Sequence, residues 1–190
     1  MCVTGKAWLK NMNKQQLRRA IKSRISRLEA KTDEARMIME RIKELPEYRE
    51  AGTVLAFIPL PDEPDIMPLL SDDPRVLFPY IEDGLMHFSA SDEFHMASYG
   101  AMEAGHAEAD YDSALMLVPL LGYSRKLQRL GRGGGFYDRY IAANRGRIIT
   151  AGVAFSISLL EDFEGEDHDA VLDMVITPDS VVRIPGNASL

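Results

Sequence analysis

The chain is poor in cysteine and has no long apolar run, and both absences exclude classes of protein. Cys2 is the only cysteine among 190 residues, which excludes an internal disulfide and a cysteine-based metal site. No apolar run approaches the roughly 18 residues of a membrane-spanning helix. Residues 1–13 have neither the apolar region nor the cleavage site of a signal peptide, and we expect them to be a flexible extension. We therefore expect a cytoplasmic protein with no membrane partner.

Positive charge is also scarce. The chain has 22 Lys and Arg against 29 Asp and Glu, so its formal net charge is −7. A general nucleic-acid binder is disfavoured, because neutralising the phosphate backbone needs clustered Lys and Arg. The basic residues instead gather in two islands, within 6–31 and within 125–147. Two basic islands in an acidic chain predict a local anionic ligand rather than a long polyanion.

The hydrophobic pattern predicts one layered α/β domain over residues 14–190. A helix over 14–30 is predicted by the helical spacing of Leu17, Ile21 and Ile25. A second helix over 32–45 is predicted to start at Thr32 and to end before Pro46. Strands are predicted at 54–58, 76–78, 85–89, 114–118, 148–155, 171–176 and 181–184, and further helices at 65–70, 136–143 and 156–160. Strands that alternate with helices indicate a mostly parallel sheet.

The most informative segment runs from Arg129 to Arg139 and reads Arg-Leu-Gly-Arg-Gly-Gly-Gly-Phe-Tyr-Asp-Arg. It follows a predicted buried strand and enters a predicted helix. Glycines let the backbone approach a ligand closely, and the free N–H groups at a helix start suit a phosphate. The spacing matches neither the Walker A loop nor the dinucleotide fingerprint. We interpret the segment as a phosphate-binding loop; the alternative is a flexible glycine turn.

Charged side chains elsewhere add candidates. Lys14 and Arg18 project from the edge of the apolar stripe of the first helix, so their partner is either an anionic ligand or solvent. Asp62 and Glu63 follow the strand that ends at Ile58, at the strand end where open α/β sheets bind ligands. A carboxylate there accepts hydrogen bonds from a heterocycle or caps a solvated turn.

Two aspartates are candidates for a magnesium site. Asp138 lies one turn into the helix after the glycines, within reach of a phosphate-bound Mg²⁺, which takes one or two carboxylates. Asp173 interrupts an apolar strand, where a carboxylate is costly unless it is paired. His168 and Asp169 lie nearby in sequence, and His168 by itself is interpreted as a loop residue.

Together these residues resemble the 5-formyltetrahydrofolate cyclo-ligase family, over nearly the whole chain from Lys14 onward. The glycine segment resembles the family signature, and the other markers occur in the family's order. They are Lys14 with Arg18, Glu63 with Asp65, Pro79, Met86 with Phe88, Tyr99-Gly100 to Glu103, Asp112 through Pro119, and His168-Asp169 to Asp173 and Thr177.

The resemblance implies a three-layer α/β/α sandwich, similar to the NagB/RpiA/CoA-transferase-like fold. It implies an enzyme, expected as a monomer, that uses ATP and Mg²⁺ to convert 5-formyltetrahydrofolate to 5,10-methenyltetrahydrofolate. ATP would be bound by Lys14, Arg18, Arg129, Leu130, Gly131, Arg132, Gly133, Gly134, Gly135, Phe136 and Tyr137. The folate would contact Arg18, Ile58, Glu63, Met86, Arg132 and Phe136. Arg132 and Glu63 would serve catalysis, and Asp138 and Asp173 would hold Mg²⁺.

The chain also departs from the family pattern. Ser124 and Leu127 stand where the family usually has Asp and Gly, Ile66 where Thr is common, and Ala104 where Pro is frequent. Two alternatives therefore stay open beside the cyclo-ligase. One is a related ATP-dependent ligase acting on another formylated amine, and the other is a non-catalytic folate- or nucleotide-binding module.

Overall fold

A computed structural model describes residues 12–71, 73–97, 100–161, 163, 165–166 and 169–184. Its centre is a seven-stranded sheet of order β11-β10-β9-β6-β1-β2-β3. The strands are β1 (Val54–Leu55), β2 (Val76–Glu82), β3 (Leu85–Ser89), β6 (Ala114–Pro119), β9 (Ile148–Val153), β10 (Met174–Ile176) and β11 (Val181–Arg183). The five strands from β10 to β2 are parallel to one another, and the edge strands β3 and β11 are antiparallel. The prediction of a mostly parallel sheet is confirmed.

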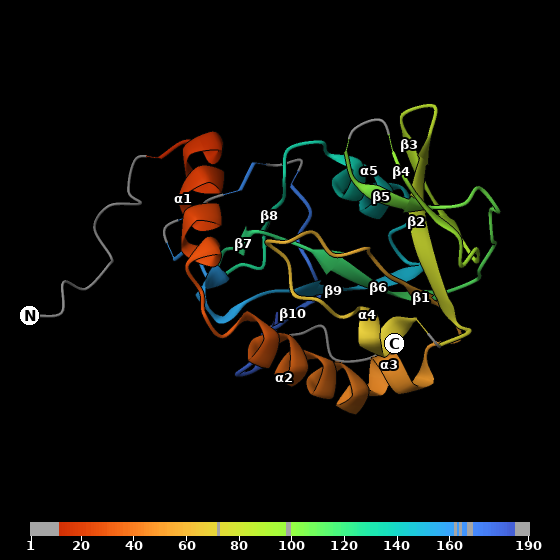
Figure 1. The fold of residues 1–190 in the computed structure, drawn as a ribbon, viewed down its shortest axis with the longest axis horizontal. Coiled ribbons are helices and arrows are strands. Elements are labelled where there is room, and N and C mark those ends of the chain that lie inside the picture. The colour runs from red at the N-terminus through yellow and green to blue at the C-terminus, as the bar shows by residue number, and fades with distance from the viewer. Residues whose placement is uncertain are drawn as a thin grey trace, which may run out of the picture.

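Helices cover both faces of this sheet. They are α1 (Lys14–Ser26), α2 (Lys31–Glu44), α3 (Pro46–Glu50), α4 (Met67–Leu70) and α5 (Phe136–Ala143). Helices α2, α3 and α4 lie along one face, α5 lies on the other, and α1 stands at one end of the molecule (Figure 1). The predicted α/β/α layering is therefore confirmed.

The two faces of the sheet are built by the alternation of side chains along each strand. In β6, Leu115 and Leu117 pack into the cluster beneath α2, while Met116 and Val118 pack into the cluster beneath α5. A central parallel strand is apolar on both faces for this reason. Each such fully buried side chain stabilises the fold by about 1.5–3 kcal/mol.

Helix α1 has a core of its own. Its buried stripe, Leu17, Ile21 and Ile25, packs against residues that include Phe155 and Leu160. The helix begins with a capping box in which the Asn13 side chain accepts from the Gln16 backbone. Of the predicted extension over 1–13, residues 1–11 lie outside the described residues, and so do Cys2, Tyr99 and His168.

Several element boundaries differ from the predictions. Helix α2 starts at Lys31, with Ala30 at the N-cap, so Thr32 was the wrong helix start. Pro46 opens α3, because a proline suits the first turn of a helix, where its missing N–H is not needed. Strand β1 ends at Leu55 rather than at 58, β10 begins at Met174 rather than at 171, and the helix predicted over 156–160 is a 3-10 turn at Ser156–Ser158.

Two small hairpins were not predicted. One pairs β4 (Phe94–Met96) with β5 (Met102–Ala104), and the other pairs β7 (Gly122–Tyr123) with β8 (Arg129–Leu130). Strands of two or three residues are too short to show a periodicity. The second hairpin fills the connection between β6 and the glycine segment. Among the described helices, none combines the length and the apolar character that crossing a membrane requires.

Candidate functional site

The glycines lie in a loop that enters α5, as predicted, but the loop follows the unpredicted strand β8 rather than β6 directly. Gly133 has φ +104° and Gly135 has φ +69°. Residues with a side chain rarely adopt these backbone conformations, because the Cβ atom would be strained there. Gly135 is the N-cap of α5 and brings no side chain to cap it. The first N–H groups of the helix therefore remain for a ligand, at the positive end of the helix dipole.

A first cavity of about 310 Å³ opens on one side of this loop. Its walls are mostly apolar and include Ile58, Tyr80, Met86 and Phe136, with Glu63, Arg132 and residues 133–135 of the loop. A mostly apolar pocket with a few converging polar groups is typical of a small-molecule site. Five of the six residues predicted to contact the folate line this cavity; Arg18 lines the next one.

A second cavity, of about 420 Å³, lies on the other side of the loop. It is more polar, and its basic members are Lys14, Arg18, Arg139 and Arg145. Asp138 and Asp169 complete its polar wall, and Gly133 and Gly135 line both cavities. The glycine loop is therefore the shared wall between an apolar chamber and a basic one.

Arg132 reaches across from the loop to the end of the segment after β1. Its Nε donates to Glu63 Oε1 at 2.8 Å, and its Nη2 pairs with Asp62. Burial acts to lower the pKa of Arg132, but the hydrogen bond to Asp62 and the charge of Glu63 outweigh it and raise the pKa. Burial acts to raise the pKa of Asp62, but Arg132 holds it below its usual value. Arg132 is thus fixed as a cation beside the apolar cavity.

Glu63 is positioned by the turn in which it lies. The residue is buried, and its Oε2 accepts from the Leu60 N–H at 3.0 Å while Oε1 accepts from Arg132. Sequence reasoning expected this carboxylate to face a heterocycle or to cap a solvated turn. Glu63 accepts a hydrogen bond within its own turn and orients the guanidinium of Arg132 at the wall of the first cavity, while its contact with a heterocycle stays a prediction.

Lys14 and Arg18 point toward the second cavity from α1. Arg18 Nε donates to the carbonyl of Gly131 at 2.8 Å, and Lys14 Nζ lies 2.7 Å from Asp169 and 3.0 Å from Glu166. Burial acts to lower the pKa of Lys14, but the hydrogen bonds to these two carboxylates outweigh it and raise the pKa. Lys14 is therefore paired with carboxylates of the protein and Arg18 with a backbone carbonyl, while the anionic ligand of these two side chains stays a prediction.

Arg129 and Leu130 are buried parts of the framework. Arg129 donates from Nε to the Pro119 carbonyl at 2.9 Å and from Nη1 to Asp138, and its guanidinium stacks on the Tyr137 ring at 5.1 Å. The Leu130 side chain packs in the core beneath α1. The predicted contacts of Leu130 with a nucleotide are therefore limited to its backbone.

The two predicted magnesium ligands have different surroundings. Asp138 lines the second cavity and accepts hydrogen bonds from Arg129 and from the Ala170 N–H. Asp173 accepts from the Thr150 N–H at 2.8 Å and from its hydroxyl at 2.7 Å, and it is not among the residues that line either cavity. Asp173 does not interrupt a strand as predicted, because β10 begins one residue later at Met174, and the Thr150 bonds satisfy its carboxylate.

Ser124 and Leu127, which differ from the family pattern, lie in a tight turn ahead of the loop. Ser124 Oγ accepts from the Lys126 and Gln128 N–H groups, both at 3.2 Å, as a short polar side chain does in such turns. Leu127 has φ +57°, the left-handed conformation that favours glycine. Its buried side chain packs in the core beneath α5 and offsets that strain.

Sequence reasoning missed several wall residues. Arg139 and Arg145 belong to the second basic island, so their charge was the available signal. Tyr80 and Met102 line the first cavity, but nothing local in the sequence sets them apart from core residues.

Comparisons with known proteins identify one family. The model of the 5-formyltetrahydrofolate cyclo-ligase family matches residues 10–178. A 5-formyltetrahydrofolate cyclo-ligase of Mycolicibacterium smegmatis is 30% identical over 66% of this chain and 73% of its own. A probable 5-formyltetrahydrofolate cyclo-ligase of Schizosaccharomyces pombe is 22% identical over 91% of this chain and 98% of its own.

A solved structure supports the fold. The 5,10-methenyltetrahydrofolate synthetase of Aquifex aeolicus superposes with a TM-score of 0.79, at 24% identity, over 94% of this chain and 96% of its own. The family match spans most of the chain, including the loop and both cavities. This chain therefore belongs to the 5-formyltetrahydrofolate cyclo-ligase family.

Proposed function

We propose that the protein converts 5-formyltetrahydrofolate to 5,10-methenyltetrahydrofolate, with cleavage of ATP to ADP and phosphate. The observation that carries the proposal is the glycine loop that lies between the apolar cavity and the basic one. A reaction that transfers a phosphoryl group from a nucleotide to a heterocyclic substrate needs the two bound side by side, as two chambers with a common wall allow. Membership of the cyclo-ligase family supports the same substrates.

The basic cavity suits the nucleotide phosphates. Lys14, Arg18, Arg139 and Arg145 line this cavity together with Gly133 and Gly135, next to the free N–H groups at the start of α5. Lys14 and Arg18 are held in place by Asp169 and by the Gly131 carbonyl, so little ordering is needed when a phosphate binds. The segment from Gly131 to Tyr137 would wrap the phosphates from the loop side.

The apolar cavity suits the folate. Ile58, Met86 and Phe136 offer apolar walls for a bicyclic ring, and the arginines that line the same cavity are Arg129 and Arg132. Arg132 Nη1 makes no hydrogen bond with any residue that the structure describes, while Nε and Nη2 are held by Glu63 and Asp62. Nη1 would therefore bind the transferred phosphoryl group at the boundary between the two cavities.

The chemistry follows from the weakness of the formyl group as an electrophile. The formyl oxygen attacks the γ-phosphorus of ATP, the bond from that phosphorus to the bridging oxygen breaks, and ADP leaves. N10 then attacks the formyl carbon, the carbon–oxygen bond to the phosphate breaks and N10 loses its proton, which gives the methenyl ring and inorganic phosphate. Phosphoryl transfer needs positioning and charge neutralisation more than a protein nucleophile. Arg132 and the N–H groups of the loop supply both.

Mg²⁺ would neutralise charge on the nucleotide phosphates when it is bound. Asp138 fits this role, because it is a half-buried carboxylate on the wall of the basic cavity. Asp173, which directly precedes β10, remains the second predicted ligand, although its carboxylate already accepts hydrogen bonds from Thr150. We further propose a monomeric, cytoplasmic enzyme in which residues 14–190 form one domain.

The activity is tested by following the rise in near-ultraviolet absorbance as the methenyl product forms. We expect the rise to require both ATP and 5-formyltetrahydrofolate and to match ADP and phosphate release one to one. Absence of conversion across a range of Mg²⁺ concentrations would contradict the proposal. ATP turnover with a different formylated amine, and none with the folate, would favour the related ligase.

A matched pair of variants on α1 tests the nucleotide cavity. Arg18 lines that cavity, whereas its neighbour Arg19 is exposed. A charged hydrogen bond contributes about 1.5–3 kcal/mol, so Arg18→Gln should raise the KM for ATP about 10- to 100-fold. Arg19→Gln should leave it unchanged. Equal effects of the two substitutions would remove Arg18 from the nucleotide site.

A further inference from the structure

A long stretch of the chain is free of positive charge. Between Arg75 and Arg125 there are 49 residues with no Lys or Arg, and eight of them are acidic. Three of the four histidines of the chain, His87, His95 and His106, lie in the same stretch. This stretch includes the β4–β5 hairpin and has no part in the basic cavity. Its composition favours a bound cation.

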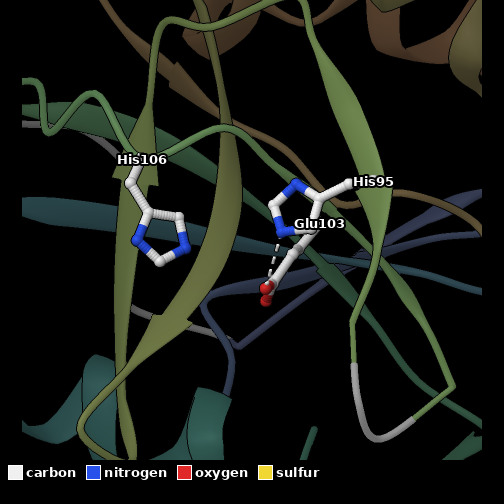
Figure 2. A group of neighbouring side chains, drawn as sticks. All are labelled: His95, Glu103 and His106. Atoms are coloured by element: carbon white, nitrogen blue, oxygen red, sulfur yellow. Dashed lines mark ion pairs between the residues drawn. The ribbon is translucent and has the colours of Figure 1, made fainter.

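Two of these histidines meet a carboxylate at the hairpin. His95 on β4 stands directly opposite Glu103 on β5, and His106 follows three residues later. Each of the three offers one ligand atom, and the three atoms all lie within 4.8 Å of one another. Figure 2 shows the Glu103 carboxylate below the His95 ring, with a dashed line joining the two, and the His106 ring beside them. One ion can therefore contact all three side chains.

We propose that His95, Glu103 and His106 form a binding site for a divalent transition-metal ion, with Zn²⁺ as the best fit. Two imidazole nitrogens and one carboxylate are a ligand set that Zn²⁺ takes, whereas Mg²⁺ and Ca²⁺ prefer oxygen ligands throughout. Three protein ligands leave the fourth position of a tetrahedral ion for water. This site is distinct from the predicted Mg²⁺ position at Asp138.

The ligands are already oriented by a second set of contacts. Glu82 Oε1 lies 3.4 Å from His106 Nδ1, which leaves Nε2 of that ring for the metal, and the Tyr80 ring stacks on His106 at 4.5 Å. The Ile81 N–H donates to Glu103 Oε2 at 3.1 Å. Contacts of this kind hold metal-binding histidines and carboxylates in position. The site needs little rearrangement to accept an ion.

The three side chains can be reached by an ion from solvent. Glu103 is buried, while the His95 and His106 side chains are about half exposed, at 50% and 44%. Without metal, His95 Nε2 lies 3.2 Å from Glu103 Oε1. A metal ion would enter between these atoms and replace any proton shared there, since ligands bind in the deprotonated form.

The position of the site links it to the first cavity. Met102, next to Glu103, and Ile81, which donates to Glu103, both line that cavity. A bound ion would join β4, β5 and residue 106 in one cluster beside β2. It would therefore fix one wall of the apolar chamber.

Direct metal binding tests the site without any substrate. Protein made without a polyhistidine tag is stripped with a chelator and titrated with Zn²⁺ by calorimetry and with Co²⁺ by visible absorption. We expect uptake of Zn²⁺ that His95→Gln and His106→Gln each weaken more than about 100-fold, because losing a contact that only orients a metal ligand already costs about 10- to 100-fold. His87→Gln is the matched control, since His87 pairs with Glu108 outside the cluster. It should bind Zn²⁺ as the parent does.

A second measurement uses the unaltered protein, in case a variant fails to fold. Zn²⁺ should protect His95 and His106, but not His87, from modification by diethylpyrocarbonate. Absence of Zn²⁺ uptake by the parent, unchanged affinity in both cluster variants, or equal modification of the three histidines would each overturn the proposal. None of these measurements uses ATP or folate, so their failure leaves the proposed activity untouched.

Discussion

Replacing Arg132 by leucine would separate its role in stability from its role at a ligand. The Arg132 guanidinium is 29% exposed and donates at 2.8 Å to a Glu63 side chain that is only 4% exposed. In the variant, the Glu63 carboxylate would stay buried with the Leu60 N–H as its remaining hydrogen-bond donor of those described. A buried charge that loses its partner is among the costliest single changes in a protein.

The size of the effect follows from this burial. Removing one member of a buried pair lowers the free energy of unfolding by about 3–5 kcal/mol. Because Arg132 is partly exposed to water, we expect a loss at the lower end of this range, about 3 kcal/mol. For a chain of this length that corresponds to a fall of roughly 6–12 °C in Tm. Adding Glu63→Gln removes the stranded charge, so the double variant should recover part of the loss. The coupling energy between the two positions should be about 1.5–3 kcal/mol.

The assay is urea unfolding of the parent, both single variants and the double variant, followed by far-ultraviolet circular dichroism. Arg125→Leu is the control, because Arg125 is 67% exposed and pairs with Glu161 at the surface; it should cost less than about 1 kcal/mol. A coupling below about 0.5 kcal/mol would refute the pairing argument. The double variant should remain at least about 100-fold less active, and recovered activity together with stability would exclude Arg132 from the reaction.

Three further predictions address the loop, the fold and the metal. Gly135→Ala should lower stability by about 1–2 kcal/mol and raise the KM for ATP, because φ is +69° and the new Cβ would lie 2.8 Å from the Arg139 guanidinium; an unchanged KM would place the loop away from the phosphates. Arg75 lowers the pKa of Asp73 to about 2 from 3.8, so Asp73 stabilises the fold above pH 4 and this contribution is lost as the pH falls toward 2. Asp73→Asn should cost about 2 kcal/mol at pH 7 by urea unfolding, and a cost that persists at pH 2 would contradict this origin. Asp138→Asn should raise the Mg²⁺ concentration for half-maximal rate at least about tenfold, and more than Asp173→Asn does; the reverse order would make Asp173 the main ligand.

Much of the fold followed from local pattern. The stripe of Leu17, Ile21 and Ile25 defined α1, and the apolar run that contains Leu115 defined β6, because burial on one face or on two leaves a period in the sequence. The start of α5 after the glycines was also predicted, at Phe136. The strands of the two short hairpins were not predicted, because two or three residues are too few to show a hydrophobic period.

The sequence by itself determined the main helices and the strands of the central sheet, and it marked the glycine loop, because periodicity and backbone freedom are local properties. Only the tertiary structure decided which charges meet. Arg132 pairs with a glutamate 69 positions away, and Lys14 with an aspartate 155 positions away. These pairs, like the meeting of His95, Glu103 and His106, depend on sheet order and strand register. Both are set by packing across the whole domain, so no single segment records them.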